Sequence, residues 1–292
     1  MSDATDEHAT DDHVYLSLAE DHDGDGEGNA RWAFGTGFED PLYGVDTAVP
    51  AGLDTAELVA QCLALADDAL VGAQRLAQWC TRAPELEEEV ALANIGLDLL
   101  GQARLLYARC GQVDGTGRGE DAYAYFRDAG DFRSARLAEL PDTDFAFCVV
   151  RLLVLSAWRL ALFGRLAAAE DPVLAAVAAK GVPELAYHRQ YAADWAVRLG
   201  DGTEESHRRM RDALAAVAPY LDELFGARPE FAAHADAVRQ EALAVLDQVL
   251  SAAGLALPPA PGAPDDSRHT PQLAPLLAEL QSVARAHPEA TW

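Results

Sequence analysis

Lysine is almost absent from this chain of 292 residues, in which Lys180 stands alone among the arginines. The 48 acidic side chains outnumber the 22 basic ones and leave a formal net charge of −26. A surface this acidic repels phosphate backbones, which excludes nucleic acid as a partner. A salt-adapted source and a GC-rich genome explain the Asp-rich, Lys-poor composition equally well, because net charge bears on solubility and not on fold.

Cysteine is also scarce, and its spacing excludes common metal and redox motifs. The four cysteines form no CxxC pair, which favours small buried thiols in a reducing cytoplasm. The most apolar run, residues 145–166, is interrupted by Arg151, Arg159 and Arg165, which argues against a membrane span. The acidic N-terminus lacks the apolar core of a signal peptide, so we expect a cytoplasmic protein.

Strand patterns are missing, and the abundant alanine and leucine predict an all-α protein. Capping residues, first-turn prolines and apolar periodicity predict helices over about 54–79, 84–110, 144–169, 171–199, 203–226, 229–254 and 271–286. The first four are long and form two hairpin-like pairs, which predicts a four-helix bundle with a long crossover and additional C-terminal helices. Pro183 falls inside the fourth helix and predicts a break or kink there.

The first 52 residues differ from the rest in composition. They are rich in aspartate, glycine and histidine, which predicts a mostly irregular acidic arm, whereas residues 53–292 form the helical domain with a linker at about 256–268. Within the arm, Asp21, Asp23 and Asp25 begin an EF-hand pattern. Trp32 occupies the twelfth position, where calcium binding requires glutamate, so we interpret this stretch as a solvated acidic tract.

The second long helix carries two apolar stripes at helical spacing. They consist of Leu86, Val90, Ala93, Leu97 and Leu100, and of Leu92, Ile95, Leu99, Ala103 and Leu106. Because most of the circumference is apolar, we expect this helix inside the bundle and not on its surface. The remaining strip holds Asn94, Asp98 and Gln102, four residues apart, which predicts a buried hydrogen-bond network.

Four-helix bundles commonly hold two irons, with a Glu from each of two helices and a Glu-x-x-His from each of the others. The Glu-x-x-His pattern occurs once, at Glu204–His207, in a first helical turn where acidic residues are expected for another reason. His188 is the only histidine expected on a core helix, and its i, i+4 spacing from Glu184 favours a local contact. We therefore predict no catalytic residue and no metal, with Asp98, Glu184 and His188 as degenerate ligand candidates.

Three segments carry a resemblance to a known family: QRLAQWCTRAPELEEEVALANIGLDLLGQAR, the stretch from AWRLALFGRL to YHRQYAADWAVRLGDGTEES, and HTPQLAPLLAELQSV. They resemble the C subunits of bacterial ring-1,2-phenylacetyl-CoA epoxidases, also called phenylacetate-CoA oxygenases, over about residues 57–292. Pro183 departs from that pattern, and the arm lies outside it.

The resemblance implies a ferritin-like bundle that has lost its metal ligands. In that family the catalytic A subunit holds the di-iron centre and epoxidises the ring of phenylacetyl-CoA with O₂, while a reductase subunit supplies electrons from NADPH. This chain would then be a structural subunit that binds and supports the A subunit in aerobic phenylacetate degradation. It would bind no cofactor itself, and its partners would be the epoxidase subunits, with no nucleic acid and no membrane.

Two other functions stay open on the residues alone. One is a di-iron carboxylate oxygenase active in its own right, with Glu88, Asp98, Glu184 and His188 as an unusual ligand set. The other is a stand-alone helical binding module. Metal content distinguishes the active oxygenase from a structural subunit. Co-purification with a homologous ferritin-like subunit distinguishes a structural subunit from a stand-alone binding module.

Overall fold

The structure is a computed structural model. It describes residues 42, 44–226, 228–259, 262, 265 and 267–290, all within the unit formed by residues 41–292. The EF-hand-like stretch and most of the predicted arm lie outside the described residues. Where the arm is described, the Thr47 carbonyl oxygen accepts a hydrogen bond of 2.7 Å from Arg109 Nη1, and Val45 packs against the core. This last part of the predicted arm is therefore attached to the helices.

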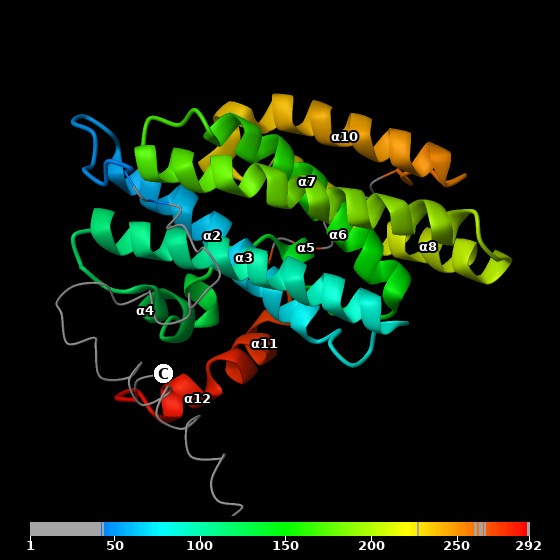
Figure 1. Ribbon diagram of the computed structural model, residues 1–292, viewed down its shortest axis with the longest axis horizontal. Coiled ribbons are helices and arrows are strands. Elements are labelled where there is room, and N and C mark those ends of the chain that lie inside the picture. The colour runs from blue at the N-terminus through cyan, green and yellow to red at the C-terminus, as the bar shows by residue number, and fades with distance from the viewer. Residues whose placement is uncertain are drawn as a thin grey trace, which may run out of the picture. The chain divides into compact units, whose positions relative to one another are not determined.

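Four long helices build the bundle (Figure 1). They are α2 (Thr55–Ala77), α3 (Leu86–Val113), α6 (Phe145–Leu166) and α7 (Pro172–Gly200). Helix α2 packs against α3 and α6 against α7, as two hairpin pairs, and α3 also packs against α7. The described residues contain no strand, which confirms the predicted all-α bundle.

Aspartate side chains cap three of these helices, at the starts predicted near residues 54, 144 and 171. The Asp54 carboxylate accepts from the backbone N–H groups of Ala56 and Glu57, Asp144 accepts from Phe147 N, and Asp171 accepts from Leu174 N. Each cap satisfies backbone donors that the first helical turn leaves without partners.

The predicted break at Pro183 is wrong, because helix α7 is continuous there, whereas a kink at this residue stays a prediction. The helix continues through this residue to Gly200. A proline inside a helix leaves the carbonyl four residues earlier without its donor. Here both Pro183 and Ala179 are exposed, so water can solvate the freed carbonyl and the helix tolerates the proline.

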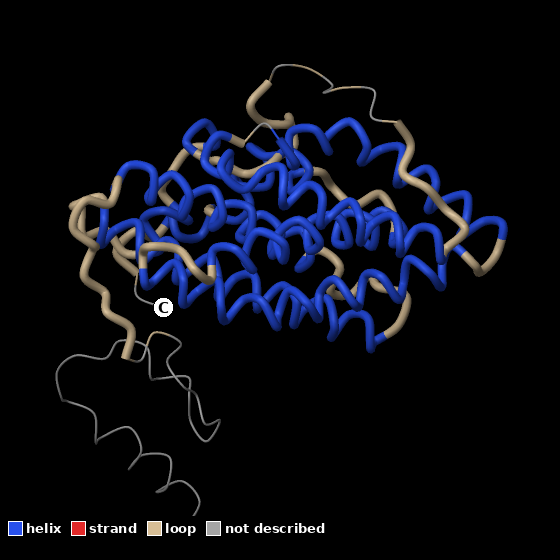
Figure 2. Tube along the Cα trace, turned by 90° about the horizontal axis from the view of Figure 1, so that it is seen from above, coloured by secondary structure: helices blue, strands red, loops and turns tan. Residues whose placement is uncertain are grey.

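Shorter helices complete the molecule. They are α4 (Glu120–Tyr125), η2 (Ala129–Asp131), α5 (Arg136–Glu139), α8 (Glu204–Val217), η3 (Ala218–Tyr220), α9 (Leu221–Gly226), η4 (Pro229–His234), α10 (Ala235–Ala252), α11 (Leu273–Leu280) and α12 (Ser282–Ala286). The two single helices predicted over 203–226 and 229–254 are each divided by a 3₁₀ turn that carries a proline near its start, Pro219 in η3 and Pro229 in η4. Figure 2 shows the long helices running lengthwise, with most loops at the two ends.

Buried carboxylates on α2 attach the connecting segments to the bundle. Asp67 accepts hydrogen bonds from Tyr107 Oη at 2.5 Å, from Arg133 N at 2.7 Å and from the Arg127 guanidinium. Its neighbour Asp68 accepts from the Arg228 guanidinium and from a backbone N–H. Two adjacent buried charges are tolerated here because each has a cationic partner.

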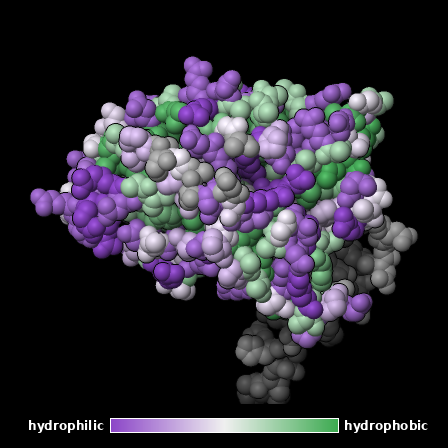
Figure 3. Space-filling view, turned by 180° about the vertical axis from the view of Figure 1, so that it is seen from behind, coloured by the Kyte–Doolittle hydropathy of each residue, from purple (hydrophilic) through white to green (hydrophobic). Residues whose placement is uncertain are grey.

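The C-terminal segment is attached through Glu139, which is completely buried. Its carboxylate accepts hydrogen bonds from Ser134 Oγ at 2.9 Å and from Thr270 N at 2.6 Å, and His269 Nδ1 lies 2.6 Å away. The segment that carries α11 and α12 is therefore fixed to the bundle at its start. On the side opposite to the view of Figure 1, hydrophilic and hydrophobic residues are interspersed (Figure 3).

Candidate functional site in the bundle interior

The two apolar stripes of α3 differ in burial. Leu92, Ile95 and Leu106 are completely buried, as expected of a core helix. Leu86 and Leu97 are 69% and 64% exposed, and Val90 on the same stripe is also exposed. The prediction that α3 lies wholly inside the bundle is therefore wrong for one face, because its helical neighbours α2 and α7 cover only part of its circumference.

The polar strip of α3 is likewise not buried along its length. Asn94 is exposed, Asp98 has 37% of its side chain exposed, and Gln102 is 2% exposed. Residues four apart rotate by about 40° around a helix, because each residue turns it by about 100°. The strip therefore winds from solvent into the core. The prediction that Asn94 belongs to a buried hydrogen-bond network is wrong, because this side chain is exposed.

Gln102 links three helices at the inner end of this strip. Its Oε1 accepts a hydrogen bond of 3.0 Å from Arg159 Nε on α6, and its Nε2 donates to Glu184 Oε2 on α7 at 2.8 Å. Glu184 also accepts from Lys180 Nζ at 2.7 Å. The amide therefore connects a guanidinium to a carboxylate, which satisfies both of its polar ends.

Asp98 and His188 form the second link between α3 and α7. His188 is buried, and its Nε2 lies 2.9 Å from Asp98 Oδ2. The contact expected between Glu184 and His188 is thus replaced by a partner on α3 for each side chain. Glu184 and His188 therefore form hydrogen bonds between helices and not with each other along α7.

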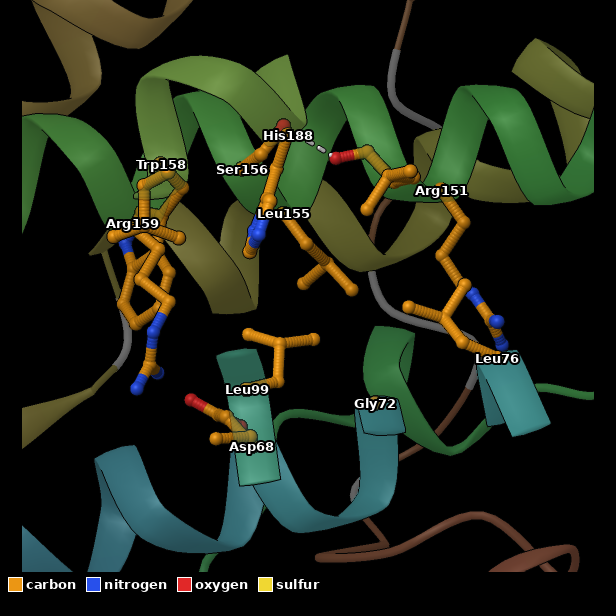
Figure 4. Close-up of a pocket in the computed structure, with 13 residues that line it drawn as sticks. Asp68, Gly72, Leu76, Leu99, Arg151, Leu155, Ser156, Trp158, Arg159 and His188 are labelled. Carbon is orange, nitrogen blue, oxygen red and sulfur yellow. Dashed lines mark hydrogen bonds between the residues drawn. The ribbon is translucent and has the colours of Figure 1, made fainter. Parts of the chain in front are cut away.

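A small cavity lies between the four long helices. Its volume is about 40 Å³, and its lining includes Leu99, Leu155, Trp158 and His188. Figure 4 shows these side chains converging from opposite sides of the bundle. Pockets for organic ligands usually measure several hundred Å³, whereas this space holds only water-sized molecules. The cavity is therefore too small for an organic substrate of that size.

Arg159 places a positive charge beside this cavity. The side chain is 4% exposed and donates to the Leu65 carbonyl oxygen as well as to Gln102, while its Nη2 has no hydrogen-bond partner. Burial lowers the pKa of Arg159 to about 10, against the opposing effect of Asp68, so the guanidinium stays charged at neutral pH. Burial raises the pKa of Asp68, and Arg228 opposes that rise.

This interior does not fit a di-iron centre. Such a centre needs about four carboxylates and two imidazoles converging in the core. Among the described residues, just one group of three carboxylate, thiolate or imidazole side chains lies within 4.8 Å, and it is Glu85, Glu87 and Glu88 at the outer start of α3. Glu88 and Asp98 are about 15 Å apart along the helix, so the ligand set of the active-oxygenase hypothesis does not converge.

Arg159 carries a sequence signal of its own. Arg151 and Arg159 interrupt the apolar run of α6, and both are buried in the structure. Among the described helices, α6 alone is long and apolar enough to span a membrane, and most of it is buried in the bundle. A charge inside an apolar core helix could have been recognised as a buried, partnered cation.

The fold and this interior define the class of protein, an all-α, ferritin-like bundle. Its centre holds the Arg159 guanidinium, and no set of metal ligands converges there among the described residues. The chain belongs to the phenylacetic acid catabolic protein family, whose profile matches residues 45–292. It is 38% identical over 251 residues to the C subunit of the 1,2-phenylacetyl-CoA epoxidase of Escherichia coli (strain K12), covering 81% of this chain and 99% of that protein. The resemblance found in the three sequence segments is confirmed.

Proposed function

We propose that this chain is a non-catalytic subunit of a phenylacetyl-CoA epoxidase, which binds and supports a catalytic di-iron subunit in the cytoplasm. The family places the chain in phenylacetate catabolism, and the Escherichia coli relative is named as the C subunit of such an epoxidase. The di-iron centre, the NADPH-linked reductase and the reaction with O₂ would then belong to partner subunits.

The observation that carries the non-catalytic role is the chemistry of the bundle centre. The Arg159 guanidinium repels divalent iron, and the nearby Asp68 carboxylate is already bound by Arg228. Gln102 and His188 take their partners from within the bundle. These side chains stabilise the packing of α3, α6 and α7, and so support a rigid scaffold for a partner.

Reconstitution tests this function. Phenylacetyl-CoA turnover would be measured with the catalytic and reductase subunits, in the presence and absence of this chain. We expect no turnover by this chain with the reductase alone, and turnover by the catalytic subunit that depends on adding the chain. Formation of the complex is followed separately by size-exclusion chromatography. Full turnover without the chain, together with no complex, would contradict the proposal.

A further inference from the structure

More than half of the exposed large hydrophobic side chains that the structure describes lie on two helices. Among the described residues they number seven: Val49, Leu86, Val90, Leu97, Phe126, Tyr187 and Val283. Four of the seven belong to two helices that pack side by side, with Leu86, Val90 and Leu97 on α3 and Tyr187 on α7. Clustering of this kind usually marks an interaction surface, whereas scattered single residues do not.

Helical geometry places the three α3 residues together. Their spacing puts them within an arc of about 40°, on the side opposite to buried Leu92 and Ile95. The Asp98–His188 and Gln102–Glu184 hydrogen bonds hold α3 against α7. The outer sides of both helices therefore form one surface, which we name the α3–α7 face (helices in Figure 1).

One end of the α3–α7 face is strongly acidic. Glu85, Glu87 and Glu88 lie together at the start of α3, and none of the three has an ion pair among the described residues. Glu88 Oε2 is buried with no hydrogen-bond partner among the described residues. Burial and the Glu88 charge both raise the pKa of Tyr191. In the part of the chain that the structure describes, no arginine or lysine pairs with the carboxylates at this end of the face.

We propose that the α3–α7 face is where the catalytic subunit docks, through an apolar helical surface that carries arginine or lysine opposite Glu85 and Glu87. This inference rests on the proposed function. A second copy of the chain is a poorer occupant, because each copy carries a net charge of −26. Its exposed arginines Arg208 and Arg209 on α8 already form ion pairs with Glu205, Asp212 and Asp144 of their own chain.

Binding measurements with the purified catalytic subunit test this assignment. L97D and Y187D place a charge in the centre of the face, and we expect each to weaken binding by about 100-fold or more. F126D and V283D are matched controls, because these side chains are also exposed but lie elsewhere, and we expect less than about a twofold change. The E85K/E87K variant should weaken binding by about tenfold and reduce its salt dependence.

The outcomes separate this inference from the proposed function. If the wild-type chain does not bind the catalytic subunit, the proposed function fails and the docking assignment fails with it. If the wild-type chain binds and L97D and Y187D bind equally well, only the docking assignment fails. Self-association of the wild-type chain that L97D abolishes, with catalytic-subunit binding unchanged, would likewise overturn it.

Hydrogen exchange provides a measurement that needs no variant. In the wild-type complex we expect slower amide exchange over residues 86–98 and 183–191 than in the free chain, and little change around Phe126. Circular dichroism would identify any variant that fails to fold. In that case the exchange result decides: protection of both segments supports the assignment, and its absence contradicts it.

Discussion

The two sides of α3 carry similar residues but face different surroundings. On one side, Leu92 and Ile95 pack completely inside the bundle, and on the other, Leu86 and Leu97 face solvent. Hydrophobic periodicity alone does not distinguish them, because it shows which residues share a side and not what covers that side. Burial within the chain explains the inner side, and the docking proposed above would account for the outer side.

Truncating one leucine on each side should give the largest contrast. L92A removes a completely buried side chain, and we expect it to lower the free energy of unfolding by about 2–5 kcal/mol. L97A, five residues further along the same helix, should change it by less than about 0.5 kcal/mol in the isolated chain. Urea unfolding measures both values. Equal losses would show that Leu97 is covered in the free protein.

The polar strip provides a second, smaller contrast. Q102L strands Arg159 Nε and a Glu184 oxygen inside the bundle, and we expect a loss of about 1–3 kcal/mol. D98A removes a partner of His188, but Asp98 is 37% exposed, so water can replace it and we expect about 1 kcal/mol or less. Unfolding experiments on both variants check the order, and a larger loss for D98A would contradict it.

These contrasts also show what the sequence could and could not predict. Asp54, Asp144 and Asp171 located three helix starts, because capping is a local interaction. The exposure of Leu97 and Asn94 depends on which helices lie beside α3, and no local pattern contains that information. The partners of Asp68 and Glu139, namely Arg228 and His269, come from more than 100 residues away in the sequence, so their pairing required the fold.

A pH-dependent effect is expected just past the C-terminal end of α3. Burial tends to raise the pKa of Asp114, but hydrogen bonds from Thr116, Tyr123 and Arg118 outweigh it and lower the pKa to about 2. Because the folded pKa lies below the unfolded value of about 4, the carboxylate stabilises the fold above about pH 4. That contribution is lost as the pH falls towards 2.

D114N should therefore destabilise the protein by about 1 kcal/mol near neutral pH, a value that allows for solvent screening of this partly exposed turn. The difference from the wild-type protein should shrink as the pH falls below about 4. Urea unfolding at several pH values measures it. A difference that stays constant over this range would show that the hydrogen bonds do not depend on the charge of Asp114.

The central claim is that the bundle interior is built for packing and not for metal chemistry. Anaerobic titration of the chain with ferrous iron, followed by desalting and metal analysis, tests it most directly. A variant with Glu85, Glu87 and Glu88 changed to glutamine separates iron bound at the surface from iron bound in the core. We expect no stoichiometric iron in either protein. About two irons per chain in both, with an oxygen-dependent absorption band, would contradict the account and favour an active oxygenase.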